Sequence, residues 1–398
     1  MSMGKYDRIF RKAEGLKSDI VGLRRHFHQH PELGLKEFET AKKVEGILKG
    51  LGLETRSFVK GAGVCGYFRG AKVGKTFALR ADMDALPLQE ESDVPYRSQT
   101  PGVMHGCGHD AHTAMLLGAA MILSEEAKQL PGNVVFLFQP AEETGQGAKE
   151  MVSEGALEGV DGIVALHVSS TYPSGTLQYR SGPIMAAGDF FDVRITGKGG
   201  HAGLPHLAID PVTMAATAIG AVQTIISREI NPVESGVISI CKMEAGQGAY
   251  NVIPEVASFG GTIRSLTPEL RDYLPRRMKE IVEGIVSGMR GSYELNLMPR
   301  FPLTVNHAGM TSFVTSVASE ILGEGKVFEI KPLLGSEDFS FYQEKVPGAF
   351  VYLGVQNEAK GIAFPHHHPR FDIDEDVLPT GTALNAALAM EYLLRNSG

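Results

Sequence analysis

The 398-residue sequence predicts an α/β protein in which a main domain with a mixed, mostly parallel sheet is interrupted by an inserted ferredoxin-like α+β domain. Three observations predict this fold class. Short, almost wholly apolar runs alternate with helical patterns up to about residue 184, a different pattern fills 185–298, and the first pattern returns over 299–398. Because the chain is too long for one ordinary core, an interrupted domain explains the return most simply.

The first segment begins with an amphipathic pattern over residues 1–20, which predicts a helix. Three later runs are β-rich and nearly all apolar: KTFALRA (75–81), NVVFLFQ (133–139) and DGIVALHV (161–168). Strands buried on both faces of a parallel sheet have this composition. Residues 112–130, HTAMLLGAAMILSEEAKQL, lie between two of the runs and predict a helix. Alternating strands and helices indicate parallel pairing.

The inserted segment, residues 185–298, opens with a run that alternates apolar and polar residues, as strands do when one sheet face meets water. Its elements are predicted as strand, helix, strand, strand, helix and strand: 190–203, 211–230, 236–246, 255–266, 268–291 and 293–301. This order is that of a ferredoxin-like sandwich. In the last segment, helices are expected over 311–322 and 379–396, with the strand GAFVYLGVQ (348–356) between them.

The composition excludes several classes of protein. A net charge of −8 argues against a nucleic-acid or anionic-membrane surface, because both are themselves negative. No apolar run approaches the ~20 residues that a membrane span needs. The N-terminus lacks the apolar core of a signal peptide, so we expect a cytoplasmic protein. Three cysteines make no disulfide framework, and Cys65 and Cys241, both in apolar runs, are expected to be buried.

Potential metal ligands follow each buried strand of the main domain. They are Asp82 and Asp84 after the first, Glu142 and Glu143 after the second, His167 within the third, and His366, His367 and His368 after the last. The functional site of an open α/β sheet lies outside the carboxyl ends of its strands. We therefore expect four separate segments to deliver carboxylates and imidazoles to the same edge.

Each of these residues has an ordinary interpretation when taken alone. Asp82 and Asp84 can cap the turn that Pro87 closes. The adjacent glutamates can be solvated loop charges, and His167 can be a hydrogen-bonded core histidine. Together the ordinary interpretations require four unrelated coincidences, whereas one shared metal site explains them all.

The loop MHGCGHDAH, residues 104–112, adds Cys107 and His109 to this set. Asp110 is placed to N-cap a helix that begins near Ala111, with or without a metal. A thiolate, imidazoles and a carboxylate suit zinc, manganese, cobalt or nickel rather than magnesium or calcium. About five ligands exceed the need of one tetrahedral ion and fit two ions about 3.5–4 Å apart. The adjacent glutamates then divide into one ligand and one free base beside a water.

From residue 24 onward the chain carries RRHFHQHPELGLKEFET, LRADMDALP, MHGCGHDAHTAMLLGAA, FQPAEETGQGA, GKGGHAG, NVIPE, GTIR, GSEDF and HHHPRFDIDE. In this order the motifs resemble those of the aminoacylase–carboxypeptidase clan of metallopeptidases. Within the clan they resemble the amidohydrolase branch, with hippurate hydrolase, N-acyl-amino-acid deacylases and plant auxin-conjugate hydrolases. The resemblance implies a zinc-exopeptidase-like catalytic domain, 1–184 and 299–398, and an inserted lid and dimerisation domain, 185–298.

The resemblance also implies the metal ligands, with a bridging thiolate among them. They are Cys107, His109, Glu143, His167 and His367. The family pattern of histidine, one residue and proline selects His367. His366 and His368 are then expected on the loop surface. Asp82 stands where other branches have a histidine ligand, so its role stays open.

Further roles follow from the same resemblance. Glu142 matches the general base that activates water and passes the proton to the leaving amine, and Asp84 matches an aspartate that orients a ligand or the base. His201 matches a histidine that stabilises the oxyanion, often from the partner subunit. Asn251 and Arg264 match residues that hold the substrate α-carboxylate, a task that suits the fork of an arginine. Without the resemblance, His201 is a solvated loop histidine and Arg264 a surface charge.

The function implied is metal-dependent hydrolysis of the amide bond of N-acyl amino acids by two divalent ions per subunit. A carboxypeptidase or dipeptidase with the same dinuclear site is the alternative within enzymes, and a non-catalytic binding relative is the alternative outside them. We expect a small N-acyl amino acid or short peptide as the partner, with neither nucleic acid nor membrane. A homodimer or a dimer of dimers is implied by the resemblance alone.

Overall fold

The computed structural model describes residues 5–126, 130–246 and 248–397 and divides the chain into two units. The larger unit comprises Met1–Ile184, Thr304–Lys331 and Glu337–Gly398. The smaller unit comprises Met185–Leu303 and Pro332–Ser336. In the chain, each of the two segments of the smaller unit therefore lies between segments of the larger one.

The larger unit is built on a mixed sheet. Within the described residues its strand order is β1 (Glu54–Phe58), β2 (Gly63–Arg69), β4 (Pro131–Gln139), β3 (Lys72–Asp82), β5 (Gly162–Pro173), β16 (Gly348–Gln356), β6 (Leu177–Tyr179) and β15 (Val327–Glu329). The central strands β4, β3, β5 and β16 are all parallel to their neighbours in that group. These central strands contain the apolar runs predicted as buried strands, so the predicted mixed, mostly parallel sheet is confirmed.

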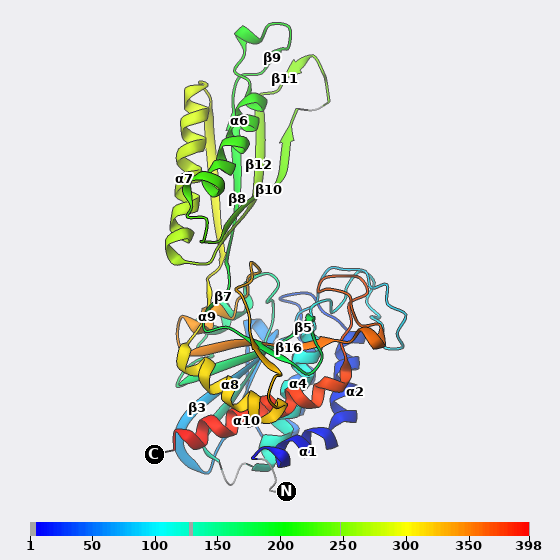
Figure 1. Cartoon of the computed structure of the whole chain (residues 1–398). Coiled ribbons are helices and arrows are strands. Elements are labelled where there is room, and N and C mark those ends of the chain that lie inside the picture. The colour runs from blue at the N-terminus through cyan, green and yellow to red at the C-terminus, as the bar shows by residue number, and fades with distance from the viewer. Residues whose placement is uncertain (1–4, 127–129, 247, 398) are drawn as a thin grey trace. The chain divides into compact units, whose positions relative to one another are not determined.

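Most helices of the larger unit pack against this sheet, and the first two pack on other helices (Figure 1). Their bounds are α1 (Asp7–Gly15), α2 (Lys17–Gln29), α3 (Phe38–Gly50), α4 (His109–Glu126), α5 (Gly147–Ser153), α8 (Ala308–Leu322), α9 (Ser340–Gln343) and α10 (Leu378–Arg395). Helix α4 lies against α2, α10 and β3 and is buried at nearly every position, as expected of a helix that is apolar all round. A Cβ at Gly118 would approach Thr382 to 2.9 Å, so the glycine allows this close packing.

Two predicted helices in this unit have different limits. The amphipathic N-terminal pattern forms two helices, α1 and α2, separated at Leu16, and residues 1–4 of that prediction lie outside the described residues. The helix predicted over 112–130 begins earlier, at His109, and is described to Glu126. Residues 127–129 lie outside the described part of the chain. No helix among the described residues has the length and apolar character needed to cross a membrane.

The smaller unit is an antiparallel sheet with two helices on one face (Figure 1). The elements are β8 (Ala187–Thr196), α6 (Pro211–Thr224), β10 (Gly236–Ala245), β12 (Val256–Ser265), α7 (Pro268–Gly288) and β13 (Ser292–Phe301). The strand order β10-β12-β8-β13 and the order of elements along the chain are those of a ferredoxin-like sandwich, as predicted. Asp210 caps α6 by accepting from the Val212 backbone N–H at 2.9 Å, and Pro211 occupies its first turn.

The two cysteines expected to be buried differ. Cys65 in β2 is fully buried, as predicted, and Cys241 is exposed, so that prediction is wrong. The register of β10 against β12 shifts between Ile240 and Lys242, which makes Cys241 the extra residue of a β-bulge on an edge strand. A bulge interrupts the alternation from which the burial was inferred.

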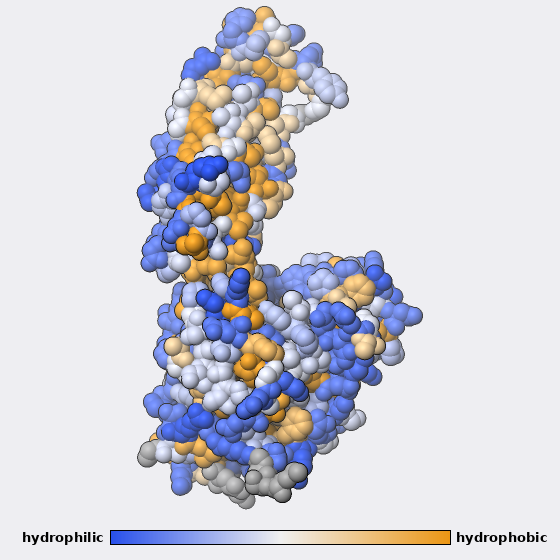
Figure 2. Space-filling view, in the orientation of Figure 1, coloured by the Kyte–Doolittle hydropathy of each residue, from blue (hydrophilic) through white to orange (hydrophobic). Residues whose placement is uncertain are grey.

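The smaller unit also exposes large apolar side chains. They are Leu204, Leu207, Val233, Met243, Tyr250, Val252, Leu297 and Leu334. Figure 2 shows apolar surface running along the visible face of this unit. Extended apolar surface on a protein marks an interaction site.

The prediction that Asp110 caps a helix is wrong, because Asp110 lies inside the first turn of α4 and pairs with a buried cation. Its Oδ2 accepts from Arg24 Nε at 2.9 Å and faces His28 Nδ1 at 2.7 Å. Arg24, fully buried in α2, also donates to Asp372 at 2.8 Å and to Glu375 at 3.2 Å. Burial alone would raise the pKa of Asp110, but Arg24 and His28 outweigh it and hold that pKa well below its usual range.

Replacing Asp110 by Asn should destabilise the protein, because it removes a charged partner of a buried guanidinium. Breaking a buried ion pair from one side costs about 3–5 kcal/mol. Denaturant unfolding measures the change in the free energy of unfolding. The surface change Glu39→Gln, in a pair with Lys42 that is exposed on both sides, is the control and should stay within ~0.5 kcal/mol of the parent. Equal effects of the two changes would contradict the role of Asp110.

Candidate metal centre

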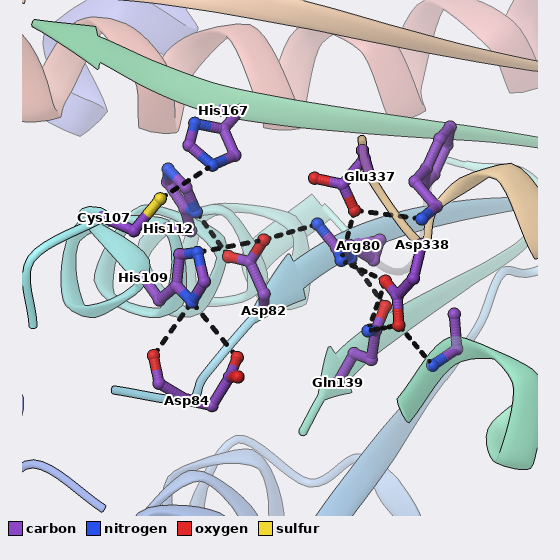
Figure 3. Close-up of polar contacts among 12 residues, drawn as sticks. Arg80, Asp82, Asp84, Cys107, His109, His112, Gln139, His167, Glu337 and Asp338 are labelled. Carbon is purple, nitrogen blue, oxygen red and sulfur yellow. Dashed lines mark hydrogen bonds and ion pairs between the residues drawn. The ribbon is translucent and has the colours of Figure 1, made fainter. Parts of the chain in front are cut away.

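Segments that are distant in sequence bring their polar side chains to the carboxyl ends of the central strands. β3 ends at Asp82, the turn after β4 carries Glu142 and Glu143, and β5 carries His167. The first turn of α4 adds His109 from the same edge (Figure 3). This is the place where parallel sheets build their sites.

His109 has one nitrogen fixed by a hydrogen bond, and its other nitrogen lies 3.7 Å from Asp82 Oδ2. Its Nδ1 lies 2.9 Å from the backbone carbonyl of Asp84 and 3.2 Å from the Asp84 Oδ1 (Figure 3). A carbonyl only accepts, so Nδ1 carries the hydrogen. Nε2 is buried and finds no hydrogen-bond partner among the described residues. Burial lowers the pKa of His109, yet Asp82 and Cys107 outweigh burial and raise it well above its usual value, so the surroundings of Nε2 favour a cation.

His167 is arranged in the same way. Its Nδ1 lies 2.6 Å from the carbonyl oxygen of Val168 and must therefore donate to it. Its Nε2 faces the Cys107 sulfur at 3.7 Å. Burial, reinforced by His112, lowers the pKa of His167 well below its usual value, so the ring is neutral and offers a lone pair.

His112 lies among the same groups, but both of its nitrogens are engaged. The Val168 N–H donates to Nε2 at 2.8 Å, so Nδ1 carries the hydrogen and donates to Asp82 Oδ1 at 2.5 Å. The other Asp82 oxygen accepts from Arg80 at 2.5 Å. Asp82, whose role the sequence left open, is thus engaged by a cation and an imidazole, and donor atoms of Asp82, His109, His112 and His167 lie within 4.8 Å of one another.

A second cluster lies beside His109. Donor atoms of Cys107, His109 and Glu143 all lie within 4.8 Å of one another. His367 Nε2 is 3.3 Å from Glu143 Oε1, and Cys107 and Glu143 together raise the pKa of His367 to about 10. With His167 on the other side of Cys107, the structure brings together all five residues expected as ligands.

His367 has φ +63°, in the left-handed region that non-glycine residues rarely adopt. Its backbone N–H donates to the Gly106 carbonyl at 2.8 Å, which ties this loop to the loop of Cys107. The preceding residue then points inward. His366, which was expected on the loop surface, is half-buried and faces the cluster: its Nδ1 lies 3.4 Å from the Cys107 sulfur, and burial lowers its pKa to about 3. His368 instead stacks on Phe364 and lies outside the cluster.

Glu142 is buried beside two further acids. Its carboxylate and those of Glu337 and Asp338 have oxygens within 4.8 Å of one another. Burial, then Glu337 and Glu143, raises the pKa of Glu142 well above its usual value. A carboxylate in such surroundings binds a proton readily, which suits a group that moves protons.

Arg80 balances part of this negative charge. The guanidinium donates to Gln139 at 2.8 Å, to Glu337 at 2.9 Å and to Asp338 at 3.1 Å, in addition to Asp82 (Figure 3). No role was inferred from the sequence for Arg80, Glu337 or Asp338. The available signals were a lone arginine inside the apolar run KTFALRA and the acidic pair of GSEDF.

The turn that carries the two glutamates is held by Glu37, a residue also missed from the sequence. Glu37 Oε1 accepts from the Ala141 N–H at 2.7 Å, and Ala141 has φ +53°. Asp84 Oδ2 accepts from the Glu143 N–H at 3.0 Å. Burial and Asp84 raise the pKa of Glu37 to about 8. Glu37 and Asp84 together fix a strained turn, and through it the positions of Glu142 and Glu143.

The three residues expected to bind substrate lie in the smaller unit. His201 in β9 (Gly200–His201) is exposed and pairs with Val252 of β11 (Val252–Ile253), next to exposed Asn251. The Gly203 N–H donates to His201 Nδ1 at 2.9 Å, which leaves Nε2–H of the neutral ring as a donor. The structure therefore brings His201 and Asn251 together.

Arg264 lies near the other end of β12, half-buried. Its Nη1 donates to the Ile263 carbonyl at 3.1 Å, and no carboxylate of the described residues pairs with it. Val256 and Arg264 are eight residues apart on an extended strand, or roughly 26 Å at ~3.3 Å per residue. Because Val256 begins the end of β12 that is nearest His201, the structure does not bring Arg264 and His201 together.

The donor set fits divalent transition-metal ions. It contains one thiol sulfur, three imidazoles and one carboxylate, a combination typical of zinc and its neighbours. A hydrogen bond from Nδ1 orients the rings of His109 and His167 so that Nε2 faces the other donor groups, which is the usual preparation of a histidine ligand.

An α/β sheet with these donors beside a buried carboxylate defines a metal-dependent hydrolase. The model of Peptidase family M20/M25/M40 matches residues 78–391, and the chain belongs to this family. The resemblance inferred from the motifs is confirmed, as is the prediction of an enzyme, specifically a hydrolase of the metallopeptidase and amidohydrolase type.

Relatives and solved structures cover nearly the whole chain. The IAA-amino acid hydrolase ILR1-like 4 of Arabidopsis thaliana is 43% identical over 379 residues, 94% of this chain and 86% of that protein. Thermostable carboxypeptidase 2 of Saccharolobus solfataricus is 43% identical over 390 residues, 95% of this chain and 98% of that protein. The Bacillus subtilis YXEP protein, a dinuclear metal binding peptidase, matches with a TM-score of 0.84 and 34% identity over 96% of this chain and 99% of its own.

Replacing Glu37 by Ala should weaken the centre through the turn that it holds. The change leaves the buried Ala141 N–H without its acceptor, and an unsatisfied buried donor costs about 1–3 kcal/mol. We expect the free energy of unfolding to fall by that amount and less metal to be retained after dialysis, as measured by denaturant unfolding and metal analysis. Glu37→Gln keeps an acceptor and is the matched control. Unchanged stability and metal content in the alanine variant would show that Glu37 does not hold the turn.

Proposed function

We propose that this hydrolase cleaves the amide bond of N-acyl amino acids and releases the acyl group as a carboxylic acid together with the free amino acid. The observation that carries the proposal is the buried carboxylate of Glu142 beside the cluster of five donors. The 43% identity to a plant protein named for hydrolysis of an IAA–amino acid supports this substrate class. The substrates are small amino acid conjugates or short peptides.

Five residues would hold two divalent ions, with zinc first and manganese, cobalt or nickel as alternatives. They are Cys107, His109, Glu143, His167 and His367. When bound, the ions supply positive charge that polarises the amide carbonyl and lowers the pKa of a water. The two-ion count is supported by the similarity to the dinuclear YXEP protein. Asp84 orients His109 and the turn of Glu143.

Glu142 moves the proton. It takes a proton from the attacking water while the water oxygen bonds to the acyl carbon, and it then delivers that proton to the amide nitrogen as the C–N bond breaks. Burial and the negative charge of Glu337 and Glu143 support this role, because they raise the pKa of Glu142 so that it can hold the proton between the two events.

Arg264 and Asn251 would hold the α-carboxylate, and His201 would donate its Nε2–H to the oxyanion. A half-buried guanidinium that forms no ion pair with a carboxylate in the described part of the chain supports the role of Arg264. A small conjugate cannot reach both Arg264 and His201 within one smaller unit, since roughly 26 Å of strand separates them. We therefore propose a homodimer, or a dimer of dimers, in which His201 and the neighbouring Asn251 serve the partner's site, and the exposed apolar side chains of the smaller unit support such an interface.

A carboxypeptidase or dipeptidase is the second candidate. The 43% identity to thermostable carboxypeptidase 2 favours it. A peptide bond is also an amide next to an α-carboxylate, so the same residues would act on it. The two candidates differ in the group on the acyl side, which is either an acyl chain or a peptide.

Glu142→Gln should abolish turnover while metal binding persists, because the amide cannot take up the proton but the five donors remain. General-base catalysis contributes roughly 10²–10⁴-fold, so kcat should fall by at least that factor. Steady-state kinetics and metal analysis of the same sample measure both quantities. Glu150→Gln, the same change on neighbouring α5, is the control and should leave kcat unchanged. Undiminished activity of Glu142→Gln would refute the mechanism.

A substrate panel should separate the two candidates. We expect higher kcat/KM for N-acetyl, N-benzoyl and indole-acetyl amino acids than for dipeptides and tripeptides. Blocking the α-carboxylate as an amide should lower kcat/KM by about 10–100-fold, in line with about 1.5–3 kcal/mol for hydrogen bonds to charged groups. Arg264→Met should remove most of this difference. A preference for peptides would replace the proposed substrate class by the second candidate.

A further inference from the structure

His366 is a half-buried imidazole beside Cys107 that has no role in the proposed reaction. Its Nε2 accepts a hydrogen bond from the Ser170 backbone N–H at 3.1 Å, and its Nδ1 lies 3.4 Å from the Cys107 sulfur. The ring centroid of Phe371 lies 5.0 Å away and that of His167 lies 5.6 Å away, so rings enclose it on two sides.

The backbone contact decides which nitrogen carries the hydrogen. An N–H group only donates, so the Nε2 that receives the Ser170 N–H must present a lone pair. In the neutral ring the hydrogen then resides on Nδ1, and Nδ1 is the atom that faces sulfur. His366 is therefore oriented as a donor toward Cys107, in contrast to His167, whose Nδ1 donates to a carbonyl and whose lone pair faces the same sulfur.

We infer that His366 is a positioning residue that donates an Nδ1–H···S hydrogen bond to the Cys107 thiolate. This inference rests on the proposed role of Cys107 as a metal ligand. The hydrogen bond fixes the direction of the sulfur and withdraws electron density from it. A thiolate that accepts such a bond donates less charge to a metal, and the metal then keeps more of its charge for polarising a substrate.

The position of His366 favours this role over two others. A metal ligand would need a lone pair facing the cluster, and the only lone pair of the neutral ring is taken by Ser170. A residue that only fills space would need no particular nitrogen toward sulfur. The neighbouring His368 shows what such a residue does here: its Nδ1 accepts from the Arg370 N–H at 3.0 Å, and its ring stacks on Phe364.

Cobalt-loaded protein gives a direct readout, because cobalt(II) bound to a thiolate has a sulfur-to-metal charge-transfer band in the near ultraviolet. His366→Leu should move this band to longer wavelength, since the sulfur becomes richer in electrons. His368→Leu, in the same loop, is the matched control and should leave it in place. An unmoved band in His366→Leu overturns the hydrogen bond, and loss of one cobalt per subunit shows that His366 is itself a ligand, which also overturns it.

Two further measurements keep the test decisive. Cys107→Ser should abolish the band; if wild type has no such band, the ligand role of Cys107 fails, and this failure is distinct from that of His366. If His366→Leu does not fold, long-range ¹H–¹⁵N correlation of histidine-labelled, zinc-loaded wild-type protein reports the tautomer without a mutation. A hydrogen on Nδ1 of His366 supports the inference, and a hydrogen on Nε2 overturns it.

Discussion

The hydrogen bonds and ion pairs of the buried Arg80 guanidinium are the interactions on which the rest of the site depends. The guanidinium crosses from β3 to Gln139 at the end of β4 and to Glu337 and Asp338, so it joins three segments of the chain at one point. One cation nevertheless faces several buried acids, since Asp82 and Glu142 lie in the same region. Without metal, burial and mutual repulsion raise the pKa of Glu142 and Asp338 well above their usual values. The edge of the sheet thus has an excess of negative charge that protons or metal cations must neutralise, and metal binding and proton release are coupled there.

The four histidines of the site differ in the backbone group that holds one of their ring nitrogens. In each ring a backbone group fixes one nitrogen: a carbonyl in His109 and His167, and an N–H in His112 and His366. A carbonyl leaves Nε2 with a lone pair for a cation. An N–H leaves a hydrogen that can be given to Asp82 or to Cys107. Backbone geometry therefore gives these four imidazoles two arrangements: in His109 and His167 Nδ1 is the donor to the backbone, and in His112 and His366 Nδ1 is the donor that faces a side chain.

Much of this arrangement was predictable from the sequence because it depends on short-range pattern. The apolar runs 75–81 and 133–139 are buried strands, and a parallel sheet brings the residues after them to one edge. The wrong predictions concern features that the neighbouring residues in the sequence do not indicate. Cys241 is exposed because of a register shift between two strands, and Asp110 pairs with an arginine 86 residues away. His366 turns inward because its neighbour adopts a left-handed backbone conformation. Each depends on a contact that cannot be inferred from the periodicity of apolar residues along the sequence.

The positions of the candidate substrate-binding residues in the smaller unit raise the question of a second copy of the chain, which the metal centre of the larger unit does not. The fold of the larger unit alone brings five donors and the buried Glu142 to one edge, so the proposed proton transfer would need no residue from a second copy. His201 instead lies in the separate β9–β11 pair, beyond the Val256 end of β12, whereas Arg264 lies near the other end of that strand, roughly 26 Å from Val256 at ~3.3 Å per residue. A ferredoxin-like sheet is rigid along its strands, because each strand is hydrogen-bonded along its length to its neighbours. Bending cannot close such a gap. If both residues act on one small substrate, they must come from different copies of the chain, and the assembly is then a condition of catalysis as well as of stability.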